Sequence, residues 1–196
     1  LHTWFVTFGL WRADNKSELK MDRHHRHAAM ISTRGASGKA EQVTQVSSFK
    51  ESMQLNDDRF LDIVPEPWWQ GPSAVMMTLF PSVIFQQQVN SVSTRHIQPS
   101  GPGNFDFVWT HFGFEDDTDE MTRRRLRQAN LFGPAGFVSA DDGEVIELSQ
   151  KGFEQKPYHR TLAELGGRDV GDTDHMVTET LIRGMYEYWR KVMEAN

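Results

Sequence analysis

Two adjacent carboxylates, Asp141 and Asp142, follow a Gly-Pro-Ala-Gly turn at residues 133–136. A helix that starts here needs one acid at its N-cap, and Asp141 has Glu144 three residues later, the spacing of a capping box. Asp142 then lies in the first helical turn, where the helix dipole favours its ionised form. A carboxylate in that position can hold a divalent cation. The alternative is that both acids only decorate the start of a helix.

A metal site built on Asp142 would need imidazole partners. The cluster Arg-His-His-Arg-His at residues 23–27 is a poor source, because its arginines repel a cation, and a solvated turn is the better interpretation. His2 stands near the first residue, where a preceding partner would not be visible. The remaining histidines are each interpreted as ordinary side chains: His96, His111, His159 and His175.

The composition sets limits on the function. The chain has 196 residues, 38% of them hydrophobic, which is typical of one globular domain. A formal net charge of −6 argues against a nucleic-acid-binding surface, and the run Arg123–Arg125 is interpreted as helix-dipole complementation. The absence of cysteine excludes disulfides, thiolate zinc sites and an iron–sulfur cluster held by this chain. The apolar opening is too short to span a membrane, so a cytoplasmic location is expected.

The elements that must position these residues are predicted from hydrophobic spacing. An antiparallel sheet with helices packed on it, an α+β fold, is the expected architecture. A hairpin turn is predicted at Pro99–Asn104, and Asp117 with Glu120 is expected to cap a helix. Strands are predicted at residues 17–27, 28–33, 73–85, 86–99 and 105–114, and helices at 48–64, 118–130, 141–151 and 173–194, with Gly152 beyond the end of the third helix.

Two stretches carry a family resemblance: "LHTWFVTFGLWRADNKSELKMD" at residues 1–22 and "LFGPAGFVSADDGEVIELSQKG" at residues 131–152. Together they resemble the catalytic domain of the large (alpha) subunit of Rieske-type non-haem iron aromatic-ring-hydroxylating oxygenases. The likeness extends to "IRGMYEYWRKVM" near the end of the chain. It implies a helix-grip-like catalytic domain over residues 1–196, N-terminally truncated, with the Rieske domain absent.

The resemblance also implies a ligand set for mononuclear Fe(II). In the family two histidines, spaced His-x4-His, and a distant aspartate hold the iron. The second histidine matches His2, the first would fall upstream of residue 1, and the aspartate matches Asp142. Two imidazoles and one carboxylate on one face of Fe(II) leave positions open for dioxygen beside the substrate. On this interpretation Asp141 caps the helix while Asp142 binds the iron.

Electrons are expected from outside this chain. The family's Rieske [2Fe-2S] cluster needs two cysteines and two histidines on an N-terminal domain, and this chain has no cysteine. The resemblance implies electrons from NADH through a ferredoxin reductase and a ferredoxin, and a small beta subunit in a hetero-oligomer. The expected reaction is hydroxylation of salicylate to gentisate, and this chain alone is expected to be inactive. A ring dioxygenase acting on anthranilate or another benzoate is the alternative within the family.

A substrate pocket is expected beside the iron. Gln86 and Gln88 point to the same side of a strand, where their amides can bond a substrate carboxylate or hydroxyl. The resemblance places further residues at the pocket: Phe132, Val138, Ser139, Met30, Trp68 and Met76. For the apolar ones, plain core packing is an equal alternative. Composition alone also fits a metal-free module that binds a flat apolar ligand.

Overall fold

The computed structural model describes residues 14–35, 57–69, 71, 74–101, 103–160 and 164–195. Six strands and three helices, with one short 3-10 helix, make up this part of the chain. They are, in order, β1 (Lys16–Met21), β2 (Ala28–Thr33), η2 (Asp58–Leu61), β3 (Ala74–Leu79), β4 (Val83–Gln88), β5 (Ser91–Gly101), β6 (Asn104–Phe112), α3 (Asp119–Phe132), α4 (Phe137–Gln155) and α5 (Thr180–Glu194).

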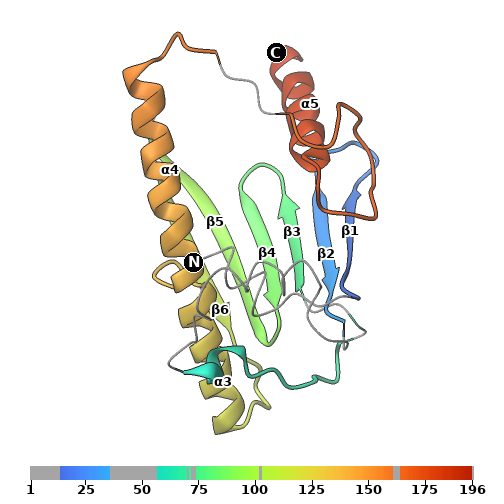
Figure 1. Ribbon diagram of the computed structural model, residues 1–196, viewed down its shortest axis with the longest axis vertical. Helices are drawn as coiled ribbons and strands as arrows, with labels where there is room; N and C mark the ends of the chain where they lie inside the picture. The colour runs from blue at the N-terminus through green and yellow to red at the C-terminus, as the bar shows by residue number, and fades with distance from the viewer. Residues whose placement is uncertain are drawn as a thin grey trace, which may run out of the picture.

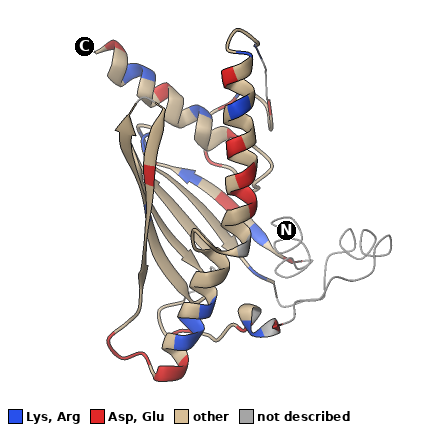
Figure 2. Ribbon diagram, turned by 90° about the vertical axis from the view of Figure 1, so that its left-hand side faces the viewer, with Lys and Arg blue, Asp and Glu red and all other residues tan. Residues whose placement is uncertain are grey.

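The six strands form one antiparallel sheet in the order β1-β2-β3-β4-β5-β6, so each strand pairs with its neighbour in sequence (Figure 1). Helices α3 and α4 follow each other along one side of the sheet, and α5 contacts β1 near the opposite edge (Figures 1 and 2). The expected α+β architecture is therefore confirmed. No helix in the described part of the chain is long and apolar enough to cross a membrane.

Two of the predicted strands are each divided by a turn. The predicted strand at residues 73–85 is interrupted at Phe80–Ser82, where Pro81 cannot donate to a strand ladder. The predicted strand at 86–99 is interrupted by a two-residue turn, Val89–Asn90, which joins β4 to β5. Neither residue of this second turn is a glycine, so the sequence carried no strong turn signal there. The hairpin between β5 and β6 falls where it was predicted.

The helix starts also differ, because other side chains and turns provide the caps. In α3 the N-cap is Thr118, whose hydroxyl accepts the Met121 N–H, and Asp117 serves elsewhere. In α4 the N-cap is Gly136, so Asp141 lies inside the helix and does not cap it. The capping-box prediction is therefore wrong at both sites. Helix α4 also continues past Gly152 to Gln155, and the Gly152 carbonyl accepts the N–H of Lys156 at the end of the helix.

Two further helix predictions change. The last helix begins at Thr180, not near residue 173, because residues 171–179 form an irregular segment that pairs with β1 through Leu19 and Thr173. Of the helix predicted at 48–64, the structure describes residues 57–64, which contain only the short helix η2. The strand predicted at 17–27 ends at Met21, because residues 23–27 form the turn that was also predicted there, with His25 in a left-handed backbone conformation.

The arginine run on α3 is not dipole complementation. Arg124 and Arg125 are both buried and face carboxylates from other parts of the chain. Arg125 pairs with Glu66 at 2.6 Å and with Asp117 at 2.7 Å, and Arg124 pairs with Asp62 at 2.6 Å. These ion pairs attach α3 to the segment 57–69, a relation that local sequence spacing does not reveal.

The apolar core lies where the junction of α3 and α4 meets the β4–β5 turn. Val89, Leu131, Phe132 and Val138 are buried there, and Phe60, Ile63 and Trp69 pack against them. The four-residue connection between the helices includes Gly133 and Gly136. A Cβ at either position would lie 2.4 Å from a backbone oxygen of α3, so only glycine permits this close approach. The Gly-Pro-Ala-Gly turn thus brings the start of α4 close against the end of α3.

Candidate active site

Cross-strand pairing lines up one side chain from each strand on the face that meets the helices. One row contains Leu19, Met30, Met76, Gln86, Ser93 and His111, and the adjacent row contains Ser17, Ser32, Ala74, Gln88 and Ser91. Residues directly opposite each other in an antiparallel pair share a face. Four of the five side chains in the second row are serine or alanine, and such small side chains leave space between the sheet and the helices.

That space is a cavity of about 960 Å³. Strands β1 to β5 form its floor, the end of α3 and the start of α4 form one wall, and residues 174–177 form another. Seven of the predicted site residues line it together: Met30, Met76, Gln88, Phe132, Val138, Ser139 and Asp142. They come from five different elements, so the sheet register and the helix junction bring them together.

The start of α4 presents its residues to the cavity by helical spacing. Val138 and Asp142 lie four residues apart and therefore on one face of the helix. Ser139, next to Val138, donates its hydroxyl to the Phe132 carbonyl oxygen at 3.1 Å, which holds α4 against the end of α3. Asp142 thus lines the cavity from the second turn of α4, without any role in capping.

The two glutamines lie on the same face of β4, as predicted. Gln86 is buried, and its Nε2 donates to the Oε1 of Gln88, which lines the cavity. Gln86 therefore does not line the cavity itself, and its hydrogen bond orients the amide of Gln88.

Besides Gln86, one described residue of the predicted site, Trp68, does not line this cavity. Trp68 is 41% exposed, donates its Nε1–H to Glu66 and packs against Phe114, so it lies outside the cavity wall. His2 lies outside the described residues.

Sequence reasoning missed Arg95 on β5, which also lines the cavity. It is the only Lys or Arg on β3, β4, β5 and β6, and Figure 2 shows how few charged residues these strands carry. Its guanidinium lies 4.2 Å from the ring centre of Trp109, a cation–π stack. A single arginine within the otherwise uncharged strand "SVSTRHIQPSG" was the available signal.

The charge of Arg95 is poorly solvated. Burial lowers the pKa of Arg95 to about 10, while the carboxylate of Asp142 acts in the opposite direction. The Nε of Arg95 is buried and has no hydrogen-bond partner among the described residues. Burial and the Arg95 charge also lower the pKa of His111, which stacks on Trp109. The site therefore holds a cation that is available to an anionic group entering the cavity.

Mononuclear iron fits this cavity only in part. Within the described ranges, no group of three His, Cys, Asp or Glu side chains is arranged to hold a metal ion. Asp142 supplies one hard oxygen ligand at the cavity wall, the donor type that a two-histidine, one-carboxylate iron site requires. Among the described residues, Asp142 is the ligand that the family resemblance assigns, and the histidine that it assigns, His2, lies outside them.

A solved structure shares the fold. Naphthalene 1,2-dioxygenase from Rhodococcus sp., bound to indole, matches with a TM-score of 0.65 and 14% identity, over the whole of this chain and 51% of that one. At this identity the match establishes the fold alone. It is an α+β fold, in agreement with the expectation from the sequence.

Sequence comparison establishes the family. The model for the ring hydroxylating alpha subunit (catalytic domain) matches residues 1–195. The chain therefore belongs to this family, whose members are ring-hydroxylating oxygenases with non-haem iron and a Rieske centre. This membership removes support for a metal-free binding module.

Individual relatives refine the picture. The chain is 79% identical over 194 residues to the salicylate 5-hydroxylase large oxygenase component of Ralstonia sp. It is 34% identical to subunit alpha 2 of the terephthalate 1,2-dioxygenase terminal oxygenase component of Comamonas sp, and 32% identical to the anthranilate 1,2-dioxygenase large subunit of Burkholderia cepacia. Each match covers 98% of this chain, but only 46–47% of the relative. The chain thus spans about half the length of these curated relatives.

Proposed function

We propose that this chain supplies the substrate pocket and the carboxylate iron ligand of an oxygenase that hydroxylates salicylate at carbon 5 to give gentisate. One atom of dioxygen enters the ring, and the other leaves as water with two electrons and two protons. The observation that carries the proposal is the cavity itself, in which the stacked guanidinium of Arg95 shares the lining with apolar, amide and hydroxyl side chains and with the carboxylate of Asp142. The 79% identity to a salicylate 5-hydroxylase component supports it.

Arg95 would bind the carboxylate of salicylate. A planar guanidinium matches a carboxylate with paired hydrogen bonds, and a desolvated cation gains more from an anion than one in water. The stack on Trp109 fixes the plane of the guanidinium. Three relatives that are at least 32% identical have printed names that refer to aromatic carboxylates: salicylate, anthranilate and terephthalate.

The remaining cavity residues would hold the ring and the hydroxyl group. Met30, Met76, Phe132 and Val138 offer apolar surface for the ring. Gln88 and Ser139 offer an amide and a hydroxyl for the 2-hydroxyl group, since both carry a donor and an acceptor. With the carboxylate at Arg95 and the 2-hydroxyl bonded, only one edge of the ring is presented to Asp142.

Asp142, together with His2 and a further histidine, would hold the mononuclear Fe(II). When bound, this iron supplies activation of dioxygen beside the ring. The charges of Asp142 and Arg95 lie close enough to interact across the cavity.

The complete enzyme would draw electrons from partners. The printed names of the relatives describe oxygenase components, which implies a multicomponent system. We propose that NADH, a ferredoxin reductase, a ferredoxin and a Rieske [2Fe-2S] centre supply the electrons, and that a small beta subunit completes a cytoplasmic hetero-oligomer. This chain by itself would lack the electron path.

The test uses the intact oxygenase, purified with its redox partners. Salicylate turnover with formation of gentisate, and loss of iron from an Asp142→Ala variant by metal analysis, are the expected results. A matched control is Glu144→Ala, an exposed acid two residues further along α4 that does not line the cavity. If Asp142→Ala retains the wild-type iron content, Asp142 is not a ligand. If no gentisate forms, the substrate assignment is wrong.

A related dioxygenase activity is the second candidate. Anthranilate differs from salicylate only in an amino group at the 2-position, and Gln88 and Ser139 can bond either group. The relative from Burkholderia cepacia carries this substrate in its name. Product analysis with both substrates separates the two candidates.

A further inference from the structure

The turn between β4 and β5 contains a residue that its backbone conformation disfavours. Val89 and Asn90 form a two-residue loop between the paired residues Gln88 and Ser91. Val89 has φ of 48°, in the left-handed region. Two-residue hairpin loops prefer glycine, asparagine or aspartate at a first position with positive φ, and a β-branched residue is an outlier there.

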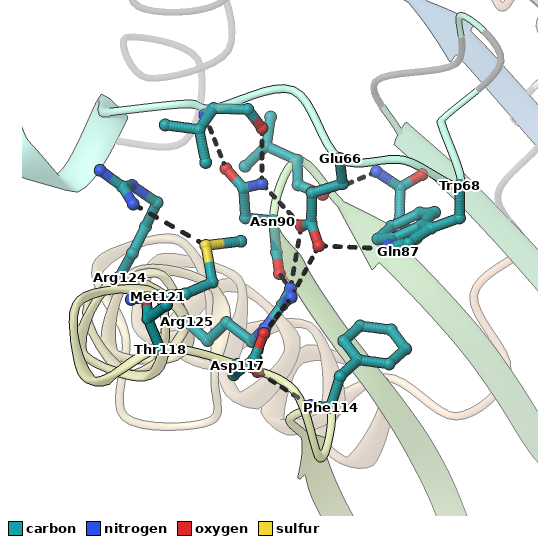
Figure 3. Close-up of polar contacts among 12 residues, drawn as sticks. Glu66, Trp68, Gln87, Asn90, Phe114, Asp117, Thr118, Met121, Arg124 and Arg125 are labelled. Atoms are coloured by element: carbon teal, nitrogen blue, oxygen red, sulfur yellow. Dashed lines mark hydrogen bonds and ion pairs between the residues drawn. The ribbon is translucent and has the colours of Figure 1, made fainter.

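The conformation of this turn is held by buried polar groups (Figure 3). The Asn90 side chain bonds both the N–H and the carbonyl of Val64, and its Nδ2 also donates to Glu66 at 2.6 Å. Arg125 donates to the Asn90 carbonyl at 2.5 Å, and its other donors bind Glu66 and Asp117. Gln87 donates to the Val89 carbonyl at 2.8 Å. The carbonyls of both turn residues are thus fixed from α3 and β4.

The side chain of Val89 reaches the cavity. It is 5% exposed, packs with Phe132 and Val138, and lines the cavity beside Gln88. Glycine would satisfy the backbone without strain, so the backbone does not explain a valine here. What valine adds is a rigid, branched side chain in the cavity wall, because its χ1 has few alternatives. Strained residues that the surroundings hold in place cluster at ligand-binding sites.

We propose that Val89 is a specificity-determining residue that contacts the aromatic ring of the substrate. The ion-pair network of Arg125, Glu66 and Asn90 holds the turn, and the isopropyl group of Val89 limits how far the ring moves along the cavity toward β4. The ring thereby keeps one position in the cavity while the carboxylate of the substrate binds Arg95. This inference rests on the proposed function.

The test compares Val89→Gly with wild type in the intact oxygenase with its redox partners. Binding of salicylate is measured by calorimetry, and coupling is measured as gentisate formed per NADH consumed. We expect the salicylate Kd to rise about tenfold, as for the loss of a few methyl contacts in an apolar pocket, and the coupling to fall. The melting temperature should change little, because the relaxed backbone offsets lost packing.

The matched control is His25→Gly. His25 is the other non-glycine residue with positive φ in the described ranges, at 57°, and it does not line the cavity. Replacement there relieves the same kind of strain, so Kd and coupling should stay at wild-type values. If Val89→Gly fails to fold, Val89→Ala keeps the test open, with the same expected loss of affinity and coupling.

The outcomes separate this inference from the proposed function. Wild-type Kd and coupling in Val89→Gly, in an enzyme that hydroxylates salicylate, would overturn the role of Val89 and leave the proposed function standing. A lower melting temperature with unchanged Kd would make Val89 a core residue only. A wild-type enzyme that neither binds nor hydroxylates salicylate would overturn the proposed function, and the inference with it.

Discussion

Two arginines of this chain, one buried and one half-buried, stand in opposite situations. Arg125 on α3 meets two carboxylates, Glu66 and Asp117, and the three side chains are only 6–8% exposed. Arg95 on β5 stacks on Trp109 and interacts with the charge of Asp142, and its buried Nε finds no hydrogen-bond partner among the described residues. Both guanidiniums lose contact with water on folding, Arg125 more completely than Arg95, but of the two only Arg125 is surrounded by acceptors.

Their pKa values reflect this difference. Burial acts to lower the pKa of Arg125, but its hydrogen bonds to Asp117 and Glu66 outweigh burial and raise it. Burial lowers the pKa of Arg95 to about 10, and Asp142 offsets only part of that effect. A buried charge that is fully paired serves the fold, whereas one left short of acceptors at a cavity wall is suited to binding an anion. The comparison therefore separates a structural arginine from a candidate ligand-binding one.

The largest expected effect is the loss of stability when the ion pairs of Arg125 are removed. Arg125→Met should lower the free energy of unfolding by about 3–5 kcal/mol, because Glu66 and Asp117 would remain buried without their partner. Urea unfolding of the intact enzyme measures it. Arg123→Met, an exposed neighbour on the same helix, should change stability by less than about 0.5 kcal/mol. If Arg125→Met lowers the free energy of unfolding by less than about 1 kcal/mol, these ion pairs contribute no more to stability than exposed surface pairs do.

Arg95→Gln tests the ligand-binding side. We expect the KM for salicylate to rise about 10–100-fold, the value of a charge-assisted hydrogen bond, with little loss of stability. Salicylamide, which has no carboxylate, should show a much smaller change. Turnover kinetics with both compounds, and a melting curve, give the answer. Equal losses for both compounds, or unfolding like that of Arg125→Met, would contradict the assignment.

Gln88→Leu tests whether the Gln88 amide forms a hydrogen bond with the substrate. Loss of one neutral hydrogen bond to the substrate should raise the KM for salicylate about fivefold, with a smaller effect on kcat. The same change leaves the buried Gln86 Nε2 without its acceptor, so a small loss of stability is also expected. Steady-state kinetics check the first effect, and an unchanged KM would remove Gln88 from the set of residues that contact the substrate.

The smallest effect is a pH dependence of stability. The hydrogen bond from Arg125 holds the pKa of Asp117 below its usual value near 4. A carboxylate with a lowered folded-state pKa stabilises the fold above its unfolded pKa, and this contribution is lost as pH falls through the folded pKa. Stability should therefore fall below about pH 4 in wild type and fall less steeply in Asp117→Asn. Parallel curves for the two proteins would show that Asp117 does not titrate with folding.

Local spacing predicted much of this chain. Alternating strands with the Pro-Ser-Gly-Pro-Gly-Asn turn predicted the β5–β6 hairpin, and α+β was the correct class. A helix that carries Asp142 was predicted after the Gly-Pro-Ala-Gly turn, although its start was placed at Asp141, and strand alternation predicted that Gln86 and Gln88 share a face. These features depend on residues within a few positions of one another, so the sequence by itself determined them.

Only the tertiary structure decided which charges meet. Arg95 and Asp142 are 47 positions apart, and Arg125 and Glu66 are 59 apart, so no local pattern links them. The caps of α3 and α4 moved for the same reason, because Asp117 pairs with Arg125 and Gly136 packs against the end of α3. Val89 takes a conformation that its side chain disfavours because distant polar groups hold it. Burial and pairing between remote segments outweigh local preference here, since a desolvated charge costs more free energy than a strained turn.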